Sequence, residues 1–523
     1  MPILQASNLS LRFADGETLF NNISFSLNDR RTGLVGRNGA GKSQLVSMLV
    51  GEREPSEGSI QSTASIGLFR QSHDEVISSS QTIAGYLQVE HIIDAIKAIE
   101  AGSVDQCWFD LVGEQWDLAE ALCIELQTLK LPENPDFLVS KLSGGQRARL
   151  TLWRIFRANF DVLILDEPTN HLDAEGQTWL RNRLAEFEGK ALVISHNRDL
   201  LRDMESIWEL NTKGLFHYGG NYDFYAKQRD IEQDALARKL AATERQIKNL
   251  DQQAQRNKEK AAQRGAMGER VRKRGGQPKI LLNAMKSSAS SADSKRLTNE
   301  SARREKLQEK ASALNEKVEQ RKALTFSVQS SSVKGGRLLS IEEGRLPFGS
   351  DRPVTFTMNA NQRCYLAGSN GSGKSTLLKV IDGELSLVSG ECHVDTPTFY
   401  LDQHFSFLKM EMSLIDNLRT YCPHLSEMEA RTLLAGIGFR RETVFRHVVA
   451  LSGGEKMKLA ISIITHQETQ PLLLLDEPDN HLDLSAKILL ASSLSSYKGA
   501  LILVSHDQSF VDDCGEMAVV LLS

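Results

Sequence analysis

Two glycine-rich loops, each ending in Lys-Ser, are the segments best suited to chemistry. They are GRNGAGKS (36–43) and GSNGSGKS (368–375). Glycines let backbone N–H groups turn inward around phosphates at a helix N-terminus. We expect Lys42 and Lys374 to reach the β- and γ-phosphates of a nucleotide, and Ser43 and Ser375 to ligate Mg²⁺. The other loop residues expected to hold the nucleotide are Gly36, Asn38, Gly39 and Gly41, and Gly368, Asn370, Gly371 and Gly373.

A pair of acids follows each loop, in LILDEPTNHLD (163–173) and LLLDEPDNHLD (473–483). Each pair ends a short apolar run typical of a buried parallel strand. Asp166 and Asp476 are expected to hold Mg²⁺ directly or through water. Glu167 and Glu477 are expected to orient, or accept a proton from, the water that attacks the γ-phosphate. The alternative is a solvated strand end without a catalytic role.

Further polar residues recur at matching intervals. His196 and His506 each lie 30 residues after the first acid of their pair, and Gln71 and Gln403 each lie 29 residues after the loop lysine. We expect the histidines to contact the γ-phosphate and the glutamines to contact Mg²⁺ or water. Chance does not produce this agreement, so the chain contains two homologous α/β domains.

Between loop and acids lie LSGGQ (142–146) and LSGGE (451–455). These motifs resemble the signature of ABC ATPases, in which the signature of one domain caps the ATP held by the loop of the other. The resemblance implies that Lys42 pairs with Ser452 and Lys374 with Ser143. The implied ATP contacts are Ser143, Gly144 and Gly145, and Ser452, Gly453 and Gly454. ATP would join the two halves and hydrolysis would release them.

The middle of the chain differs in charge from the rest. The 523-residue chain has a net charge of −5, but residues 227–322 hold 25 Lys or Arg and 13 Asp or Glu, a net charge of +12. A basic segment in an acidic protein indicates contact with a polyanion. No apolar run approaches the ~20 residues that cross a bilayer. No secretory signal is visible and no two of the six cysteines form a CxxC pair, so we expect free thiols and a cytoplasmic location.

The basic segment has the periodicity of two packed helices. Leu236, Leu240, Ile247 and Leu250 follow 4-then-3 spacing, and Leu307, Ala311, Leu314 and Val318 repeat it. Glycines from Gly265 onward separate the helices, so we expect an antiparallel hairpin with a basic turn. The candidate contacts to RNA phosphates are Arg270, Arg272, Lys273, Arg274 and Lys279. A solvated charge run is the alternative.

Tandem cassettes, DEPTNHLD, GNYDFY (220–225) and a long charged linker together resemble the ABC-F proteins. The resemblance implies two tandem P-loop ABC ATPase domains, 1–221 and 334–523, joined by a basic helical linker, 222–333. It also implies a monomer that closes its cassettes on ATP and Mg²⁺ at the tRNA exit region of the ribosome. Its linker would reach the P-site tRNA, as in translation factors and in ribosome-protecting antibiotic-resistance proteins. The alternatives are the ATPase subunit of a transporter and a DNA-maintenance ATPase.

Two details depart from the family pattern. Asp479 stands where the family usually has Thr, so the two sites are expected to cycle unequally. Domain one carries about 23 extra residues, which lie within 88–121. The stretch 88–121 has a net charge of −7, and we expect it to form a helical extension that binds RNA poorly. The resemblance also implies an aromatic that stacks on the ATP base, for which Phe13 in domain one and the stretch from Arg345 to Phe348 in domain two are the candidates; an ordinary core Phe is the alternative. The chain ends 17 residues after His506, so no further domain is expected.

Overall fold

The structure is a computed structural model that describes residues 4–13, 18–70, 80–211, 213–274, 298, 301–314, 336–402, 405–467, 470–480 and 482–522. The chain divides into two compact units. One consists of Met1–Tyr225 with Leu324–Ser523, and the other is Ala226–Ala323. The first unit contains both copies of the sequence repeat. We call the copy before the linker cassette 1 and the copy after it cassette 2.

The main sheet of cassette 1 has the strand order β5-β6-β7-β3-β8-β9. Its strands are β3 (Arg31–Gly36), β5 (Ile66–Phe69), β6 (Val162–Asp166), β7 (Lys190–Ile194), β8 (Ser206–Asn211) and β9 (Gly214–Gly219). All neighbours are parallel except β8 and β9, which are antiparallel. Every residue of β6 is buried, as expected for an apolar run in a sheet covered on both faces.

A second, antiparallel sheet of cassette 1 has the order β2-β1-β4. Its strands are β1 (Leu4–Arg12), β2 (Thr18–Ser26) and β4 (Glu57–Ser62). One buried cluster joins this sheet, helix α1 (Lys42–Leu49) and the main sheet, through residues such as Phe20, Leu45 and Ile164. The cluster holds the strand–loop–helix segment that carries the first phosphate loop between two sheets.

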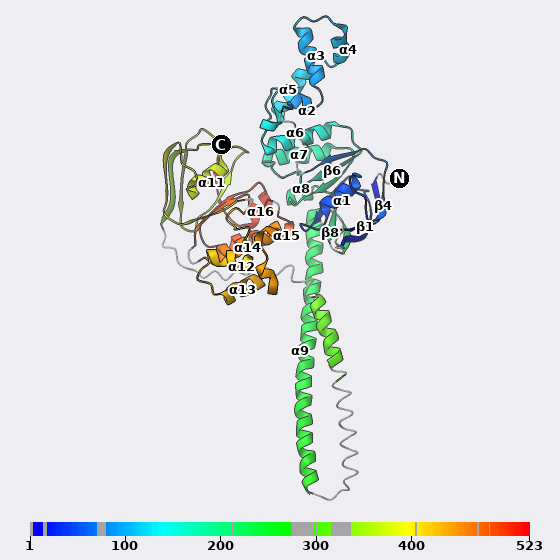
Figure 1. Cartoon of the computed structure of the whole chain (residues 1–523), viewed down its shortest axis with the longest axis vertical. Helices are drawn as coiled ribbons and strands as arrows, with labels where there is room; N and C mark the ends of the chain where they lie inside the picture. The colour runs from blue at the N-terminus through cyan, green and yellow to red at the C-terminus, as the bar shows by residue number, and fades with distance from the viewer. Residues whose placement is uncertain are drawn as a thin grey trace. The chain divides into compact units, whose positions relative to one another are not determined.

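Helices make up the rest of cassette 1. They are α2 (Ile83–Tyr86), α3 (Glu90–Glu100), α4 (Gln106–Val112), α5 (Leu118–Thr128), α6 (Gly144–Arg157), α7 (Ala174–Glu186) and α8 (Arg198–Arg202), with a 3₁₀ turn at Val139–Lys141. Helices α3 and α4 occupy the acidic insertion and share a small apolar cluster that includes Ile92, Ile96 and Val112. They lie together at the end of the helical part of this cassette (Figure 1).

Cassette 2 repeats this plan without α3 and α4. Its main sheet is parallel, in the order β14-β15-β16-β12-β17, and its antiparallel sheet has the order β11-β10-β13. The strands are β10 (Arg337–Arg345), β11 (Val354–Asn359), β12 (Arg363–Ala367), β13 (Ser389–Val394), β14 (Thr398–Leu401), β15 (Leu472–Asp476), β16 (Leu501–Val504) and β17 (Ala518–Leu521). The helices are α11 (Lys374–Asp382), α12 (Leu414–Tyr421), α13 (Glu427–Gly436), α14 (Gly453–Thr465), α15 (Leu484–Ser496) and α16 (Gln508–Asp513), with 3₁₀ turns at Arg441–Phe445 and Val448–Ala450. The fold class predicted from the sequence is therefore confirmed.

The linker begins with helix α9 (Tyr222–Arg274), 53 residues long. Residues 301–314 form a helix beside it, and the Nε of Arg304 lies 3.2 Å from the Oδ1 of Asp251. The sequence placed the end of the first helix before Gly265, but α9 continues through both Gly265 and Gly268. Each glycine costs a helix about 1 kcal/mol relative to alanine, and the neighbouring alanines Ala261, Ala262 and Ala266 are the best helix formers.

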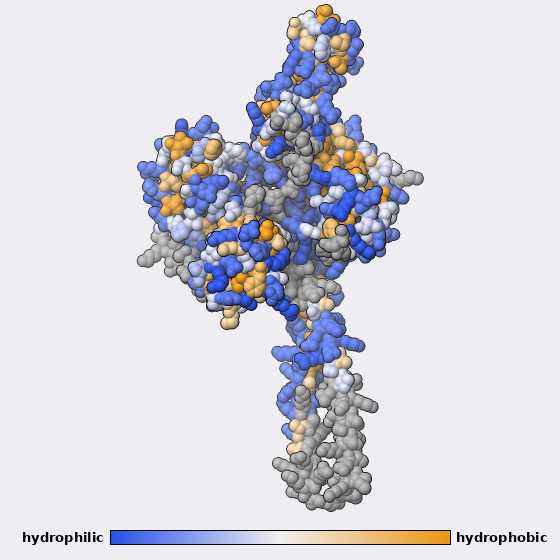
Figure 2. All heavy atoms as spheres, in the orientation of Figure 1, coloured by the Kyte–Doolittle hydropathy of each residue, from blue (hydrophilic) through white to orange (hydrophobic). Residues whose placement is uncertain are grey.

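On the face shown in Figure 2, hydrophilic residues prevail with apolar residues scattered among them. No helix in the described part of the chain combines the length and apolar character that spanning a bilayer requires. Exposed apolar side chains occur in the insertion and just after it, among them Val104, Leu111 and Trp116. All six cysteines are unpaired thiols.

Candidate active sites

Both phosphate loops join a strand to a helix, and their glycines fix the shape. Gly41 and Gly373 have φ angles of 96° and 97°, in the left-handed region that favours glycine. A Cβ on Gly41 would lie 2.5 Å from the side chain of Leu19, so a larger residue does not fit. Within the described residues, neither α1 nor α11 has a side-chain cap. Their first N–H groups therefore suit the oxygens of a phosphate.

The two loop lysines fold back along their own loops. Lys42 Nζ donates to the carbonyl oxygen of Gly36 at 2.6 Å and lies 3.1 Å from the Nε2 of His196. Lys374 Nζ donates to the carbonyl oxygen of Gly368 at 2.8 Å. Burial lowers the pKa of both lysines. Each ammonium group is thus held at the start of its phosphate loop in a partly desolvated setting, where an anion is a favourable partner.

The residues expected to hold Mg²⁺ are brought together. Ser43 Oγ donates to the Oδ2 of Asp166 at 3.1 Å, and Ser375 makes the corresponding bond to Asp476. Burial raises the pKa of both carboxyl groups. No cluster of three or more His, Cys, Asp or Glu side chains in the described part of the chain could hold a metal by itself. One carboxylate and one hydroxyl fit a Mg²⁺ ion whose remaining ligands are phosphate oxygens and waters.

The two glutamates next to these aspartates adopt the same unusual backbone. Glu167 has φ of 49° and Glu477 has φ of 48°, the left-handed region that non-glycine residues rarely occupy. The backbone N–H of each donates at 2.9 Å to the neighbouring strand, at Ile194 and at Val504 respectively. A strained conformation that recurs at the same motif position is typical of a functional site.

The environments of the two glutamates differ. Burial raises the pKa of Glu167 to about 7. Its Oε2 accepts from the backbone N–H of His196 at 3.3 Å. Burial also acts on Glu477, but the imidazole of His506 and the ammonium of Lys374 outweigh it, so the pKa of Glu477 falls below its usual value. The Nε2 of His506 lies 3.3 Å from the Oε1 of Glu477.

The histidine of cassette 1 lies in a buried and charged setting. His196 is buried beside the Lys42 ammonium, and burial together with this charge holds the pKa of His196 well below its usual value. It is therefore neutral at pH 7, and its Nδ1 has no hydrogen-bond partner among the described residues. The buried Oε1 of Glu167 also lacks one in that part of the chain. A buried polar atom without a partner is costly, which fits a site built to receive a polar substrate or water.

The two signature motifs begin helices α6 and α14. Ser143 and Ser452 are their N-caps, each in a capping box closed by the residue three positions later. This local structure places the signature glycines in the first helical turn. The positive end of the helix dipole at these glycines favours an anion such as a phosphate.

Contacts across the cassette interface involve both phosphate loops. Asn370 Nδ2 donates to the carbonyl oxygen of His171 at 2.8 Å, and a Cβ on Gly145 would lie 2.8 Å from the same nitrogen. In the opposite direction, the backbone N–H of Asn38 donates to the Oδ2 of Asp483 at 3.3 Å. The second loop thus meets the first signature motif. The pairing of Lys42 with Ser452 stays a prediction.

For some of the expected site residues the structure describes no side chain. Gln71, Gln403 and Lys279 fall outside the described residues. The candidate RNA contacts Arg270, Arg272, Lys273 and Arg274 lie in the last turns of α9, and only their backbone is described.

The candidates for stacking on the ATP base differ in exposure. The Arg53 guanidinium lies over the ring of Phe13, 5.4 Å from its centre. Phe348 is 69% exposed, and a Cβ on Gly373 would lie 3.0 Å from its carbonyl oxygen. Phe13 is partly exposed and Phe348 is exposed beside the second loop, so each stays a candidate for the ATP of its own cassette.

Other residues of the sites were missed by sequence analysis. Tyr400 donates its hydroxyl to the Oδ2 of Asp476 at 2.9 Å, and Leu68 occupies the corresponding position of cassette 1. Gln177 and Lys487 lie 11 residues after the first acid of each pair, and both line a cavity of about 190 Å³ between the cassettes. A position-by-position comparison of the repeats would have found all of them.

Fold and sites define the class of protein: a P-loop ATPase with two ATP-binding cassettes in one chain. A family model described as ABC transporter matches residues 20–170 and 352–480, and a second with the same description matches residues 208–274. The uncharacterized ATP-binding protein YkpA of Bacillus subtilis is 30% identical over 97% of this chain and 92% of its own length. The ATP-binding protein Uup of Haemophilus influenzae is 30% identical over 92% and 72%, and the ABC transporter F family member 5 of Arabidopsis thaliana is 28% identical over 95% and 72%. The chain belongs to the ABC-F family, and it hydrolyses ATP.

Solved structures share the tandem arrangement. The RNase-L inhibitor superposes with a TM-score of 0.51 at 17% identity, over 98% of this chain and 87% of that one. A structure of the archaeal ribosome recycling factor aABCE1 with the stalk protein aP1 gives a TM-score of 0.52 at 17% identity, over the same fractions. At this level of identity the likeness supports the fold alone.

Proposed function

We propose that this ATPase binds the ribosome near the tRNA exit site in its closed, ATP-bound state, and that its linker then adjusts the P-site tRNA or relieves stalled translation. The observation that carries the proposal is the net charge of residues 227–322 of the linker, +12 in a chain whose net charge is −5. A polyanion is the partner that such a charge attracts. This surface has no evident use in the ATPase subunit of a transporter.

Each ATP site would use its residues in the same way. The glycine loops, Lys42 and Lys374 would bind the phosphates, with the signature residues of the opposite cassette closing over them. Ser43 with Asp166, and Ser375 with Asp476, would hold Mg²⁺, which when bound neutralises charge on the phosphates. Gln71 and Gln403 would contact the metal or its waters.

Hydrolysis would depend on the glutamate and histidine of each site. Glu167 and Glu477 would orient the attacking water and accept its proton, because each carboxylate lies on a fixed, strained turn beside the metal ligands. His196 and His506 would contact the γ-phosphate. Loss of the γ-phosphate removes the group shared by the two cassettes, so the protein would open and leave the ribosome.

Five basic residues at the expected turn of the linker, which we call the linker tip, supply the test. Arg270, Arg272, Lys273, Arg274 and Lys279 are replaced together by Ser, and binding to purified ribosomes is measured by sedimentation at several salt concentrations. We expect unchanged basal ATP hydrolysis, weaker binding and a flatter salt dependence, by roughly 0.7–0.9 in log–log slope for each lost phosphate contact. The matched control removes five exposed charges from the cassettes: Arg183, Lys213, Lys409, Arg440 and Lys498.

The outcomes separate the candidate functions. If tagged protein sediments with membranes or with nucleoid and not with ribosomes, the proposal fails in favour of a transporter subunit or a DNA-maintenance ATPase. If the tip variant binds ribosomes with the wild-type salt slope, the basic run is solvated surface and the linker is a spacer. We further propose that the protein works in the cytoplasm. Drug susceptibility of deletion and overexpression strains would separate a housekeeping factor from a resistance determinant.

A further inference from the structure

Three polar positions near the cassette interface differ in charge between the two repeats. Cassette 1 has Thr169, Gln177 and Asn197, which we call the neutral trio. The matching positions of cassette 2 hold Asp479, Lys487 and Asp507, the charged trio. Each trio has one member three residues after the first acid, one 11 residues after it and one directly after the histidine. Three changes from neutral to charged at matched positions indicate one functional difference.

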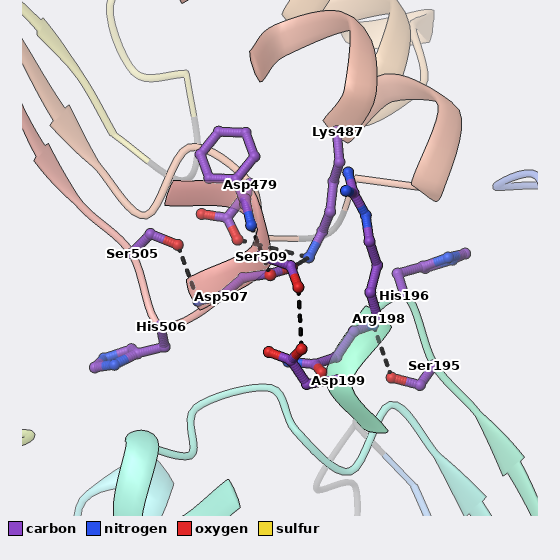
Figure 3. A network of polar contacts seen from close by, with 12 residues as sticks. Ser195, His196, Arg198, Asp199, Asp479, Lys487, Ser505, His506, Asp507 and Ser509 are labelled. Atoms are coloured by element: carbon purple, nitrogen blue, oxygen red, sulfur yellow. Dashed lines mark hydrogen bonds and ion pairs between the residues drawn. The ribbon is translucent and has the colours of Figure 1, made fainter. Parts of the chain in front are cut away.

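The charged trio is bonded within cassette 2. Lys487 Nζ lies 2.7 Å from the Oδ2 of Asp507 and 3.5 Å from the Oδ2 of Asp479. All three side chains are less than a tenth exposed. Figure 3 shows the Lys487 side chain pointing between the two aspartates. Burial alone would lower the pKa of Lys487, but the two carboxylates outweigh it and raise the pKa, so the ammonium stays charged and bound.

The neutral trio is bonded differently. Asn197 Nδ2 donates to the Oε1 of Gln177 at 3.1 Å, which fixes the orientation of the Gln177 amide. Gln177 Nε2 then donates at 3.2 Å to two backbone carbonyl oxygens, that of Leu172 in its own cassette and that of His506 in cassette 2, and the second bond is the one that matters here. This bond crosses from helix α7 of cassette 1 to the strand end that carries the histidine of cassette 2. Lys487, at the matching position, bonds to its own cassette.

Both trios contribute to the cavity between the cassettes. Its lining includes Gln177 and Lys487 together with Glu167, His196 and His506. The two trios therefore line the same cavity as groups that are proposed to act in hydrolysis. A side chain here can change the position of a histidine across the interface without touching the nucleotide.

We infer that Gln177 is a positioning residue that acts across the interface on His506. The two aspartates of the charged trio bind Lys487, so Lys487 does not make the matching bond to His196. The site of cassette 2 is thus coupled directly to the polypeptide of cassette 1, while the site of cassette 1 lacks the reciprocal bond. This inference rests on the role proposed for His506. It gives a structural basis for unequal cycling of the two sites, since Asp479 is a member of the charged trio.

The test measures each site separately by single-turnover hydrolysis of bound ATP. Glu167→Gln leaves the site of cassette 2 as the hydrolysing site, and Glu477→Gln leaves that of cassette 1. We expect Gln177→Ala to slow the site of cassette 2 by about three- to tenfold, the range that one neutral hydrogen bond supplies, with ATP affinity unchanged. Gln177→Glu keeps the shape but loses the donor, and should slow the same site equally.

Two further variants complete the design. Thr178→Ala is the control, because this exposed residue on the same helix bonds only within α7, to the carbonyl oxygen of Ala174, in the described part of the chain. The triple change Asp479→Thr, Lys487→Gln and Asp507→Asn installs the neutral trio in cassette 2. The side chains of the neutral trio already fit the same fold in cassette 1. We expect it to shift the ratio of the two hydrolysis rates by about threefold or more toward the site of cassette 1.

Each result decides the inference. Equal slowing of both sites by Gln177→Ala, full activity of Gln177→Glu, or an unchanged rate ratio in the folded triple variant would overturn it. His506→Ala separates this failure from failure of the underlying role. If His506→Ala abolishes hydrolysis by cassette 2 while Gln177→Ala has no effect, only the inference is wrong. If His506→Ala is fully active, the role of His506 is wrong and the inference falls with it.

Discussion

Closure of the cassettes should depend on an ion pair between Arg198 and Asp513. Arg198 begins α8 in cassette 1, Asp513 ends α16 in cassette 2, and a guanidinium nitrogen of Arg198 donates to the carboxylate of Asp513. Beside this pair, Ser509 Oγ donates to the Oδ1 of Asp199 at 3.0 Å, as Figure 3 shows. The two helices that follow the histidines therefore meet each other across the interface.

The magnitude follows from burial. The Arg198 side chain is 9% exposed and that of Asp513 is 41% exposed. A charge-assisted bond with one solvated partner contributes about 1–2 kcal/mol. Arg198→Ala should therefore raise the ATP concentration for half-maximal closure about five- to thirtyfold. Asp513→Ala should cost more, because it leaves a buried guanidinium without its carboxylate.

Closure can be followed by energy transfer between labels on Lys213→Cys and Lys498→Cys, in a chain that also carries Glu167→Gln and Glu477→Gln to prevent hydrolysis. Labelling requires replacement of the exposed native Cys107. Arg181→Ala is the control, since Arg181 pairs with Asp203 inside cassette 1. An unchanged ATP dependence in Arg198→Ala, or strict additivity of the two changes in the double variant, would refute the reasoning.

Three other perturbations have defined outcomes. Glu167→Gln with Glu477→Gln should keep the protein ATP-loaded on ribosomes and stop protein synthesis, so normal translation in an extract with ATP and excess variant would contradict the proposed roles. Removal of roughly 90–118 should leave ATP hydrolysis nearly unchanged and ribosome affinity within about tenfold, because the insertion is acidic; a larger loss of binding by folded protein would give the insertion a direct role. Asn417→Ala should destabilise cassette 2 by about 2–3 kcal/mol in urea unfolding, because the buried amide satisfies two carbonyl oxygens and the N–H of Lys409; an unaltered midpoint would mean that other groups replace these bonds.

The sequence predicts the features that each repeat specifies locally. The apolar runs before Asp166 and Asp476 predicted buried parallel strands, and the structure has them as β6 and β15. The glycine loops predicted strand–loop–helix units, and both are present. These predictions succeeded because a motif needs its own strand and helix, whatever the rest of the chain does.

Features that depend on contact between distant segments left no periodic signal. The bond from Gln177 to the carbonyl oxygen of His506 joins residues 329 positions apart. The hydroxyl of Tyr400 reaches Asp476 only because β14 and β15 are neighbours in the sheet. Helix α9 passes through Gly265 and Gly268 because neighbouring residues outweigh these two unfavourable positions, which a rule about single residues does not capture.

One guanidinium connects the first turn of α9 with cassette 2. Arg202 donates from Nε to the Oδ1 of Asp223 at 3.2 Å and from a terminal nitrogen to the Oγ of Ser509 at 3.0 Å. Because one side chain holds both partners, a change at the cassette interface that moves Ser509 also acts, through Arg202, on the residue with which α9 leaves cassette 1.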